Sequence, residues 1–247
     1  MNVLEIDNVT FAYDDFRGQK GDDILQKVSF TVGQGESVGL IGANGVGKST
    51  LLKLLCGLLP LQQGRVTIIG KDLQKNHLKA IREQVGYVFQ DSDSQLFMTT
   101  IYEDVAFGPR NYGKSREEVE SLVMNALRQV HIEHLREKQV YRLSGGEKKL
   151  ASIATILAMP TQLILLDEPT VALDPKNRRN LINVLNELPQ AKLVASHDLD
   201  FIYDTCSKVI LLSGKGVAQI GPAETLLRDR SLLEEHGLEL PLSFIHR

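Results

Sequence analysis

The 247-residue chain is 43% hydrophobic and 24% charged, and its formal net charge is −3. This composition predicts an ordinary soluble core in one large domain, or in a domain with a subdomain, and gives no support to electrostatic binding of nucleic acid. No apolar run approaches the roughly 20 residues that span a bilayer, and residues 1–5 lack the pattern of a signal peptide.

The first part of the chain, residues 3–41, is expected to be rich in β-strands. Apolar and polar residues alternate over residues 28–32, which is the pattern of a half-buried strand. Residues 14–23 are polar and contain glycine, so we expect a loop there, directly after Tyr13.

A glycine loop follows at residues 42–50 and fits the pattern G-x-x-x-x-G-K-[ST], which binds the phosphates of a nucleoside triphosphate. An apolar strand-like run, residues 38–41, precedes the loop, and a helix-like run, residues 51–55, follows it. Backbone N–H groups of such a loop approach phosphate oxygens, and the helix N-terminus adds partial positive charge. Lys48 is expected to bind the β- and γ-phosphates and Ser49 to ligate Mg²⁺; an ordinary glycine turn is the alternative. The expected nucleotide-binding residues are Gly42, Ala43, Asn44, Gly45, Val46, Gly47, Lys48, Ser49 and Thr50.

Residues 91–159 hold no convincing strand and predict helices inserted into an α/β core. Ser115 and Glu118 form a capping-box pattern ahead of an amphipathic helix, and a second helix follows Gly146. The apolar residues of the two helices are Val119, Leu122, Val123, Ala126, Leu127 and Val130, and then Leu150, Ile153, Ala154 and Leu157.

The core resumes with predicted strands at residues 163–166, 192–195 and 209–212. Alternation of strands and helices implies a mostly parallel sheet that is covered on both faces. From Pro222 onward the pattern predicts short helices.

The two cysteines, Cys56 and Cys206, lie in helix-like apolar contexts far apart in the sequence. We expect both to be buried free thiols in a reducing cytoplasm, because cytoplasmic proteins rarely form disulfides.

Polar residues stand where several predicted strands end. Asp167 and Glu168 follow the apolar run 163–166, and ligands of open α/β sheets bind at the carboxyl ends of the strands. We expect Asp167 to hold Mg²⁺ and Glu168 to polarise a water in line with the γ-phosphate; a solvated loop is the alternative. Gln90 and His197 also follow strands, although each alone would be a surface glutamine or a structural histidine.

The segment 143–147 predicts a second phosphate site. Ser144 is a good N-cap, and Gly145 and Gly146 expose backbone N–H groups at the positive end of a helix. Because the glycine loop of the same chain already binds the phosphates, we expect this site to bind a nucleotide held by another subunit.

These motifs, in this order, resemble the ATPase subunits of ABC transporters over nearly the whole chain. Residues 42–50 correspond to the Walker A loop, Gln90 to the Q-loop and residues 143–147 to the signature. Residues 163–168 correspond to the Walker B strand, residues 172–174 to the D-loop and His197 to the switch histidine.

The resemblance implies one ABC ATPase domain over residues 1–247: a P-loop NTPase (RecA-like) α/β core with an antiparallel β subdomain and a helical signature subdomain. The core with its β subdomain would comprise residues 1–90 and 160–221, the helical subdomain residues 91–159, and a C-terminal tail residues 222–247. The resemblance further implies a head-to-tail dimer, in which each ATP, with Mg²⁺, lies between one subunit's Walker A loop and the other's signature.

The roles that the resemblance implies concern catalysis, metal binding, nucleotide binding and the D-loop. The catalytic residues would be Glu168, His197 and Gln90, and the metal ligands would be Ser49, Gln90 and Asp167. The nucleotide would be bound by Tyr13, the Walker A residues, Ser144, Gly145 and Gly146, and Asp174 would belong to the D-loop. Tyr13 would stack on adenine, with a core aromatic at a strand end as the alternative.

Two positions depart from the family pattern. The signature ends in Glu147, where glutamine is usual, and the D-loop begins with Val171-Ala172, where Ser-Ala or Ala-Gly is common. A carboxylate near the partner's γ-phosphate would either be harmless, since Ser144 and Gly146 offer the contacts, or weaken ATP-driven closure.

Three segments, residues 88–97, 102–109 and 237–241, resemble the ATPases of energy-coupling-factor (ECF) importers. In those systems ATPases at the cytoplasmic face of the membrane join a transmembrane coupling protein and a small membrane protein that binds substrate. The short tail favours a homodimer, and the favoured cargo is cobalt or nickel ion, with a vitamin as the alternative. Two alternatives would also bind ATP. A non-transport ABC ATPase is disfavoured because the chain lacks long coiled coils, and a regulatory module without turnover is disfavoured because Lys48 and Glu168 are intact.

Four carboxylates surround the link between core and insertion: Asp91, Asp93, Glu103 and Asp104. We expect them to receive basic coupling helices of a membrane partner, and a solvated acidic face is the alternative. His131 and His134 have helical spacing, and two histidines so spaced on a helical surface are more often solvated than bound to a metal.

Overall fold

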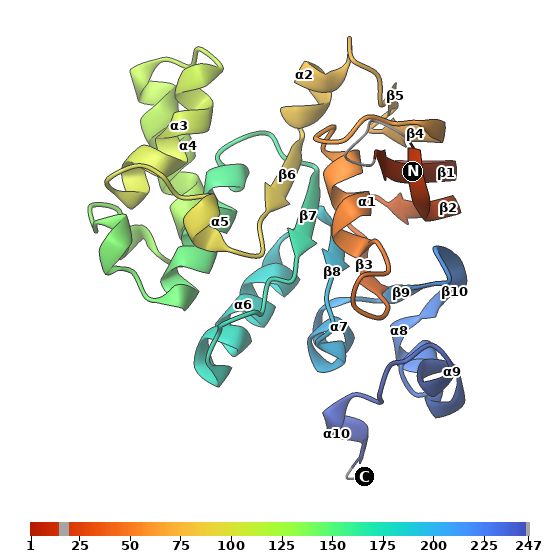
Figure 1. Ribbon diagram of the computed structural model, residues 1–247. Helices are drawn as coiled ribbons and strands as arrows, with labels where there is room; N and C mark the ends of the chain where they lie inside the picture. The colour runs from red at the N-terminus through yellow and green to blue at the C-terminus, as the bar shows by residue number, and fades with distance from the viewer. Residues whose placement is uncertain (15–19, 246–247) are drawn as a thin grey trace.

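The computed structural model describes residues 1–14 and 20–245, which form two sheets, a group of helices and a helical tail (Figure 1). The smaller sheet is antiparallel, with strand order β2-β1-β4-β5. Its strands are β1 (Asn2–Asp14), β2 (Lys20–Gly33), β4 (Gln63–Ile68) and β5 (Lys71–Asp72).

The loop predicted over residues 14–23 is wrong where the structure describes it. Strand β1 continues to Asp14, strand β2 begins at Lys20, and these two residues pair across the hairpin. Polar residues therefore extend the hairpin beyond its buried part, because backbone pairing does not require an apolar face. Residues 15–19 lie outside the described residues.

The larger sheet has strand order β10-β9-β3-β8-β7-β6. Five neighbouring strands are parallel, and β10 pairs antiparallel with β9 at one edge. The strands are β3 (Ser37–Ile41), β6 (Val85–Val88), β7 (Leu163–Asp167), β8 (Ala191–Ala195), β9 (Lys208–Ser213) and β10 (Gly216–Pro222). Every residue of β7 and β8 is buried, as expected for parallel strands that are covered on both faces.

Helix α1 (Lys48–Leu55) lies between the two sheets, whereas α6 (Pro175–Glu187) and α7 (Leu199–Thr205) cover the other face of the larger sheet (Figure 1). Four leucines of α1 are fully buried in the core that joins the sheets: Leu51, Leu52, Leu54 and Leu55. The packing of α1 therefore fixes the loop before it against the carboxyl ends of the strands.

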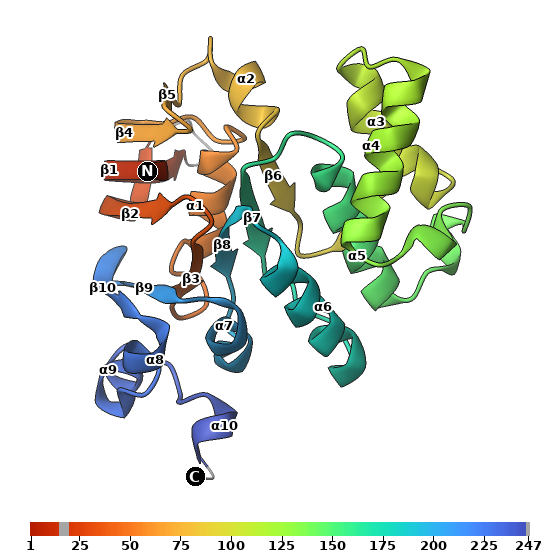
Figure 2. The same ribbon diagram turned by 180° about the vertical axis from the view of Figure 1, so that it is seen from behind.

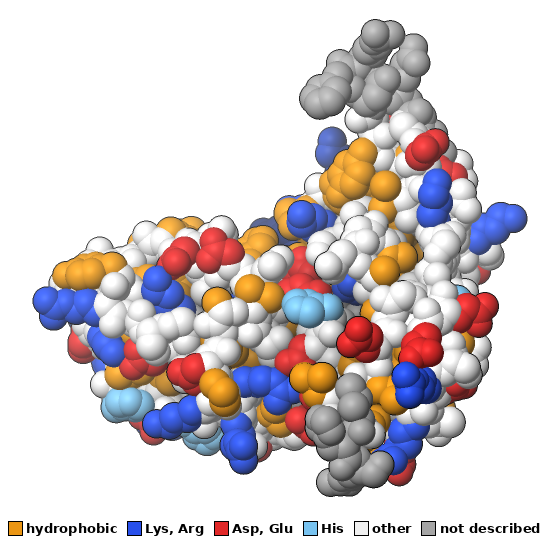
Figure 3. Space-filling view, turned by 60° about the horizontal axis from the view of Figure 1, so that its bottom comes forward, with side chains coloured by type: hydrophobic (Ala, Val, Ile, Leu, Met, Phe, Trp, Pro, Cys, Tyr) orange, Lys and Arg blue, Asp and Glu red, His pale blue; other side chains and the backbone are white. Residues whose placement is uncertain are grey.

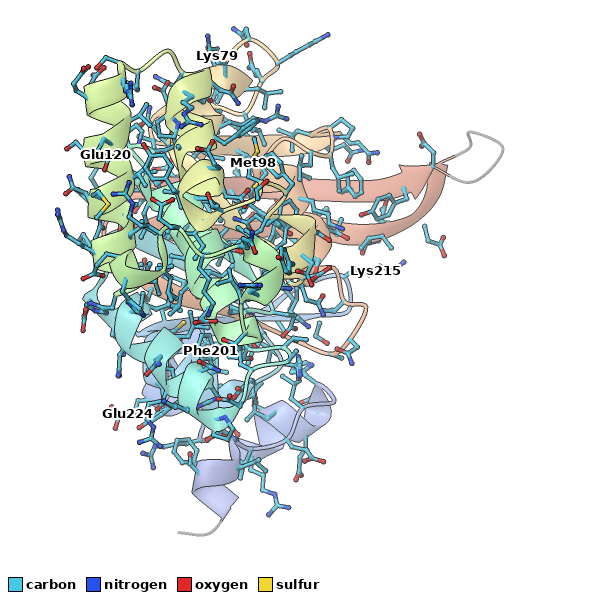
Figure 4. All side chains as sticks on the ribbon, turned by 90° about the vertical axis from the view of Figure 1, so that its left-hand side faces the viewer. Lys79, Met98, Glu120, Phe201, Lys215 and Glu224 are labelled. Carbon is cyan, nitrogen blue, oxygen red and sulfur yellow. The ribbon has the colours of Figure 1, made fainter. Side chains whose placement is uncertain are left out.

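A group of helices stands to one side of the larger sheet, as both ribbon views show (Figure 2). It contains η1 (Ser92–Ser94), α3 (Ile101–Asn111), α4 (Arg116–Gln129), η2 (Glu133–Leu135), η3 (Val140–Arg142) and α5 (Gly145–Leu157), while α2 (Leu78–Arg82) precedes β6. The capping box predicted for Ser115 and Glu118 is confirmed at the start of α4. Figure 4 shows this helical layer, with Glu120 on α4 and Met98 in the segment before α3. The domain boundaries at residues 90 and 160 stay predictions.

The predicted short C-terminal helices are confirmed as α8 (Ala223–Leu226), α9 (Arg230–Glu235) and α10 (Leu242–Ile245). Asp200 of α7 accepts backbone hydrogen bonds from Leu242 and Ser243, so the tail is attached beside α7. Cys56 and Cys206 are buried free thiols, as predicted. In residues 1–14 and 20–245 we find no helix that is long and apolar enough to cross a bilayer.

Candidate functional site

The glycine loop ends at Gly47, which is the N-cap of α1 and has a φ of 105°. This left-handed conformation favours glycine, and a Cβ at this position would lie 2.8 Å from Cδ2 of Leu25. Helix α1 then begins at Lys48, so its free N–H groups and partial positive charge face the loop. The predicted order of strand, glycine loop and helix is confirmed, and phosphate binding at the loop stays a prediction.

The ammonium group of Lys48 folds back onto the glycine loop. Its Nζ donates to the carbonyl oxygens of Gly42, at 2.7 Å, and Ala43, at 3.3 Å. Burial lowers the pKa of Lys48, and the nearby carboxylates of Glu168 and Asp167 act in the opposite direction. A buried cation thus faces the two carboxylates at the end of β7.

Asp167 joins the glycine loop to the parallel sheet. Ser49 Oγ donates to Oδ1 of Asp167 at 2.8 Å, and the hydroxyl of Tyr87 donates to Oδ2 at 2.9 Å. Burial and the adjacent Asp167 raise the pKa of Tyr87, so its hydroxyl stays a donor. Tyr87 was not predicted from the sequence, because nothing local indicates that β6 lies beside β7.

Glu168 has a φ of 43°, a left-handed conformation that costs a non-glycine residue about 1–3 kcal/mol. Its backbone N–H donates to the carbonyl of Ala195 in β8. Its Oε2 accepts hydrogen bonds from Ser196 Oγ and from the backbone N–H of His197, both at 3.2 Å, and lies 2.7 Å from Nδ1 of His197. The carboxylate is therefore held by the segment that follows β8.

These side chains surround a cleft of about 540 Å³. The predicted site residues that line it are Tyr13, Asn44, Gly45, Gly47, Lys48, Ser49, Thr50, Gln90, Glu168 and His197. The surface is hollowed where two lobes meet, with acidic and histidine side chains at the base of the hollow (Figure 3). Residues from four separate predicted motifs and Tyr13 thus meet around one cavity.

The signature residues do not line this cleft. Ser144 caps α5 in a capping box, in which Glu147 Oε2 accepts from the Ser144 N–H and Ser144 Oγ accepts from the Glu147 N–H. Gly146 is buried, because a Cβ there would lie 2.2 Å from Cγ of Asn177. Asp174 of the D-loop caps the helix α6 that carries Asn177. The signature and the D-loop therefore pack together outside the cleft.

The unusual Glu147 is paired with a cation, Lys138, that was not predicted from the sequence. Lys138 Nζ donates to both carboxylate oxygens of Glu147, at 2.8 and 3.0 Å. Burial would raise the pKa of Glu147, but the hydrogen bonds from Lys138 and Ser144 outweigh it and hold the pKa below its usual value. The extra negative charge in the signature is neutralised within the chain.

The predicted acidic docking surface is wrong for Asp104, which is buried, and stays a prediction for Asp91, Asp93 and Glu103. Asp104 is only 4% exposed, and its Oδ1 accepts from the N–H groups of Phe97 and Met98. The other three carboxylates bind groups of the same chain: Asp91 caps η1, Asp93 pairs with Lys148, and Glu103 pairs with Arg110. Charge in the sequence did not reveal these internal partners.

The face beside these carboxylates carries two exposed aromatic side chains. The rings of Phe97 and Phe107 make an edge-to-face contact with centroids 4.9 Å apart, and Phe97 is 63% exposed. Large apolar side chains that stay exposed as a pair are more informative than a single exposed leucine.

The family model described as "ABC transporter" matches residues 25–171. The chain belongs to the ABC transporter ATPase family. An energy-coupling-factor transporter ATP-binding protein of Carboxydothermus hydrogenoformans is 41% identical over 246 residues, which cover 98% of this chain and 89% of the relative. The resemblance to ECF ATPases predicted from the sequence is thereby confirmed.

Two solved structures share the fold. CbiO1 from Clostridium perfringens, part of the ABC transporter complex cbiONQ, has a TM-score of 0.84 and 32% identity, covering 97% of this chain and 96% of that protein. The dimeric ATP-binding cassette MJ0796 in a post-hydrolysis state with ADP and Pi has a TM-score of 0.78 and 27% identity, covering 89% and 98%. The predicted P-loop NTPase fold, with parallel and antiparallel sheets, is confirmed.

Proposed function

We propose that this ABC ATPase is the motor subunit of an ECF-type importer and works as a head-to-tail homodimer on the cytoplasmic face of a membrane. The observation that carries the proposal is the position of Glu168, whose carboxylate lines the cleft beside the Walker A loop and contacts His197. The ECF relative supports the class of transporter.

In the proposed reaction Glu168 accepts a hydrogen bond from the water that attacks the γ-phosphate. Phosphoryl transfer depends chiefly on positioning and on neutralisation of charge, so one well-placed carboxylate suffices for the water. Ser196 and His197 fix its Oε2, which limits the orientations that Glu168 adopts. The strained backbone of Glu168 is consistent with a position kept for function.

Lys48 supplies the charge for the β- and γ-phosphates. Its contacts to the carbonyls of Gly42 and Ala43 hold the ammonium at the loop, and ATP oxygens would replace these carbonyls as its partners. The N–H groups at the start of α1 add further donors.

The oxygen ligands that Mg²⁺ prefers are present at this place. The ion would be held by Ser49, Asp167 and Gln90. Ser49 Oγ already lies 2.8 Å from Oδ1 of Asp167, and Gln90 lines the same cleft as Ser49. Bound Mg²⁺ neutralises charge that develops on the phosphates.

The dimer explains why the signature does not line the cleft of its own chain. We infer that Ser144, Gly145 and Gly146 bind the γ-phosphate of the partner's ATP and that Asp174 lies at the dimer interface. The dimeric MJ0796 cassette supports this arrangement. Tyr13 would stack on adenine, since its exposed ring lies beside the Walker A loop and its hydroxyl is 3.3 Å from Thr50 Oγ1.

The variant Glu168→Gln tests the proposal. Removal of the carboxylate should lower ATP turnover at least about 100-fold, the lower end for general base catalysis. ATP binding should persist, so an ATP-bound dimer should accumulate in size-exclusion chromatography with light scattering. Unchanged turnover would remove Glu168 from its role.

The chain offers a matched control in Glu187→Gln. Glu187 also contacts a histidine, since its Oε2 lies 3.0 Å from Nε2 of His131, but this pair is exposed and away from the cleft. The control should keep the turnover and the monomer–dimer behaviour of the unchanged protein.

For the cargo we propose a transition-metal ion, cobalt or nickel, and for the partners a transmembrane coupling protein and a substrate-binding membrane subunit, with no nucleic acid. The high structural similarity to CbiO1 of the cbiONQ complex supports the metal branch. The intact membrane complex should be isolated through the ATPase and assayed for ATP-dependent uptake of radioactive cobalt and nickel. Uptake of a vitamin instead would contradict the metal branch alone, and a complex without membrane subunits would contradict the transport function.

A further inference from the structure

Residues 89–95, here called the Q segment, connect strand β6 to the helical group. The last register pair between β6 and β7 joins Val88 with Leu166. From Phe89 onward the hydrogen bonds of the segment run within it or to helix α5, and the ring of Phe89 packs against Tyr87. The chain leaves the sheet at the end of β6 and runs to α5 (Figure 2).

Lys149 of α5 makes the first attachment. The residue is only 2% exposed, and its Nζ donates to the carbonyl oxygens of Phe89, at 2.8 Å, and Gln90, at 2.9 Å. A buried ammonium group needs such acceptors, because an unpaired buried charge is strongly destabilising. In the chain the two carbonyls lie on either side of the Cα of Gln90, the residue that lines the cleft.

Gln95 makes the second attachment. Its Oε1 accepts from the N–H of Phe89 at 3.1 Å, while its Nε2 donates to the Ser152 carbonyl at 2.9 Å and to Thr155 Oγ1 at 3.1 Å. One side chain therefore bridges the start of the Q segment to α5. Ser152 lies three residues after Lys149, so both attachments use the same face of the helix.

We propose that Lys149 and Gln95 are positioning residues that attach the Q segment to α5, so that Gln90 moves with the signature helix and not with the sheet. The N-terminus of α5 carries the signature, which faces the partner's nucleotide, whereas Gln90 lines the cleft of its own chain. The helix thus links the two nucleotides of a dimer. The inference rests on the proposed function for the roles of Gln90 and the signature.

The test uses Lys149→Met and Gln95→Leu, in which the new side chains are similar in size to the old ones but lack their hydrogen-bonding groups. In steady-state Mg²⁺-ATP hydrolysis each variant should lower kcat about tenfold with KM within about twofold, the pattern of a group that acts after substrate binds. Amide hydrogen exchange of residues 89–95 should become faster. Lys149→Arg, which keeps the charge and the donors, should recover most of kcat.

Lys192→Met is the matched control. Lys192 of β8 is a second buried lysine, only 4% exposed, and does not line the cleft. Its Nζ donates to the carbonyl oxygens of Leu188 and Gln190, at 2.7 and 2.8 Å. The variant Lys192→Met should lose stability as Lys149→Met does, yet it should keep the kcat of the unchanged protein and its exchange rate at residues 89–95. If Lys149→Met and Lys192→Met have equal kcat, or if exchange of the Q segment is unchanged in Gln95→Leu, the proposal is wrong.

The outcomes separate this inference from the proposed function. Absence of ATP turnover in the unchanged protein would overturn the proposed function, while the exchange measurement would still report whether α5 holds the Q segment. Normal turnover together with unchanged exchange in both variants would overturn the inference alone. If Lys149→Met does not fold, Gln95→Leu, which removes no charge, decides the question.

Discussion

Ser49 donates a hydrogen bond to Asp167 at 2.8 Å, although the two residues are 118 positions apart in the sequence. The contact joins the first turn of α1 to the carboxyl end of β7, and the hydroxyl of Tyr87 fixes the other oxygen of Asp167. A carboxylate held from both sides presents its oxygens in a defined direction, which is what a metal ligand requires.

Tyr87→Phe should weaken Mg²⁺ binding without loss of ATP binding. Removal of a hydrogen bond to a metal ligand commonly costs about tenfold in metal affinity or more, so we expect about that rise in the Mg²⁺ concentration for half-maximal turnover. Tyr203→Phe, which loses an exposed hydrogen bond from Arg228, is the control and should not change it. Equal Mg²⁺ dependence of the two variants would contradict the role of Tyr87.

The pair of Lys138 and Glu147 should matter for turnover. Lys138→Met leaves the signature carboxylate uncompensated, which in the proposed dimer would lie near the partner's γ-phosphate, so we expect a several-fold fall in turnover and less ATP-driven dimer. Glu147→Gln should restore both in the double variant, because the repelling charge is gone. Double-mutant cycles isolate such a coupling, and additive effects of the two changes would show that none exists.

Local patterns were sufficient to predict the motif residues, the strand ends and most helices. The glycine loop, the Asp167-Glu168 pair and the capping box at Ser115 are each written within a few consecutive residues. Parallel strands place their carboxyl ends at one edge, so the meeting of Gln90 and His197 also followed from the sequence.

Contacts between distant segments could not be predicted in the same way. Lys149 and Gln95 depend on the packing of α5 beside the Q segment, which joins residues about 60 positions apart. The burial of Asp104 was missed because an aspartate in a charged stretch is usually solvated. No local signal distinguishes Asp104, which binds two backbone N–H groups, from its partly exposed neighbour Glu103.

Tyr13→Ala should weaken ATP binding, whereas Tyr13→Phe should keep it. Stacking of a base on an aromatic ring contributes about 1–3 kcal/mol, so the alanine variant should raise the Kd of a fluorescent ATP analogue at least about fivefold. The phenylalanine variant loses only the hydroxyl near Thr50. Tyr141→Phe and Tyr141→Ala provide an exposed aromatic control away from the cleft. Unchanged Kd in Tyr13→Ala would favour the alternative of a structural strand-end aromatic.

The buried thiol of Cys206 predicts a loss of stability in alkali. Burial raises the pKa of Cys206 from 9.0 to about 12. Between these values the unfolded chain releases the thiol proton and the native chain keeps it, so the free energy of unfolding falls as pH rises, by up to about 1.4 kcal/mol per pH unit. Below pH 9 both states hold the proton and the effect is absent.

Urea unfolding of the unchanged protein and of Cys206→Ala between pH 8 and 10.5 measures this effect. The stability of the unchanged protein minus that of the variant should fall with pH, by about 2 kcal/mol at pH 10.5. Parallel curves would mean that the thiol ionises equally in both states.

In the proposed importer, the exposed pair of Phe97 and Phe107 should contact the membrane subunits. The two rings lie beside the Q segment, and the carboxylates first expected to form this contact bind groups of their own chain. Phe97→Ser with Phe107→Ser should therefore remove apolar contact area, so that less membrane subunit co-purifies with the ATPase from detergent extracts. Because neither ring lines the nucleotide cleft, ATP turnover of the isolated ATPase should stay within about twofold, as for surface changes with small energetic effect. Leu58→Ser, at an exposed leucine after α1, is the control and should leave the complex intact. Full recovery of the membrane subunits with the double variant would place their contact elsewhere on the molecule.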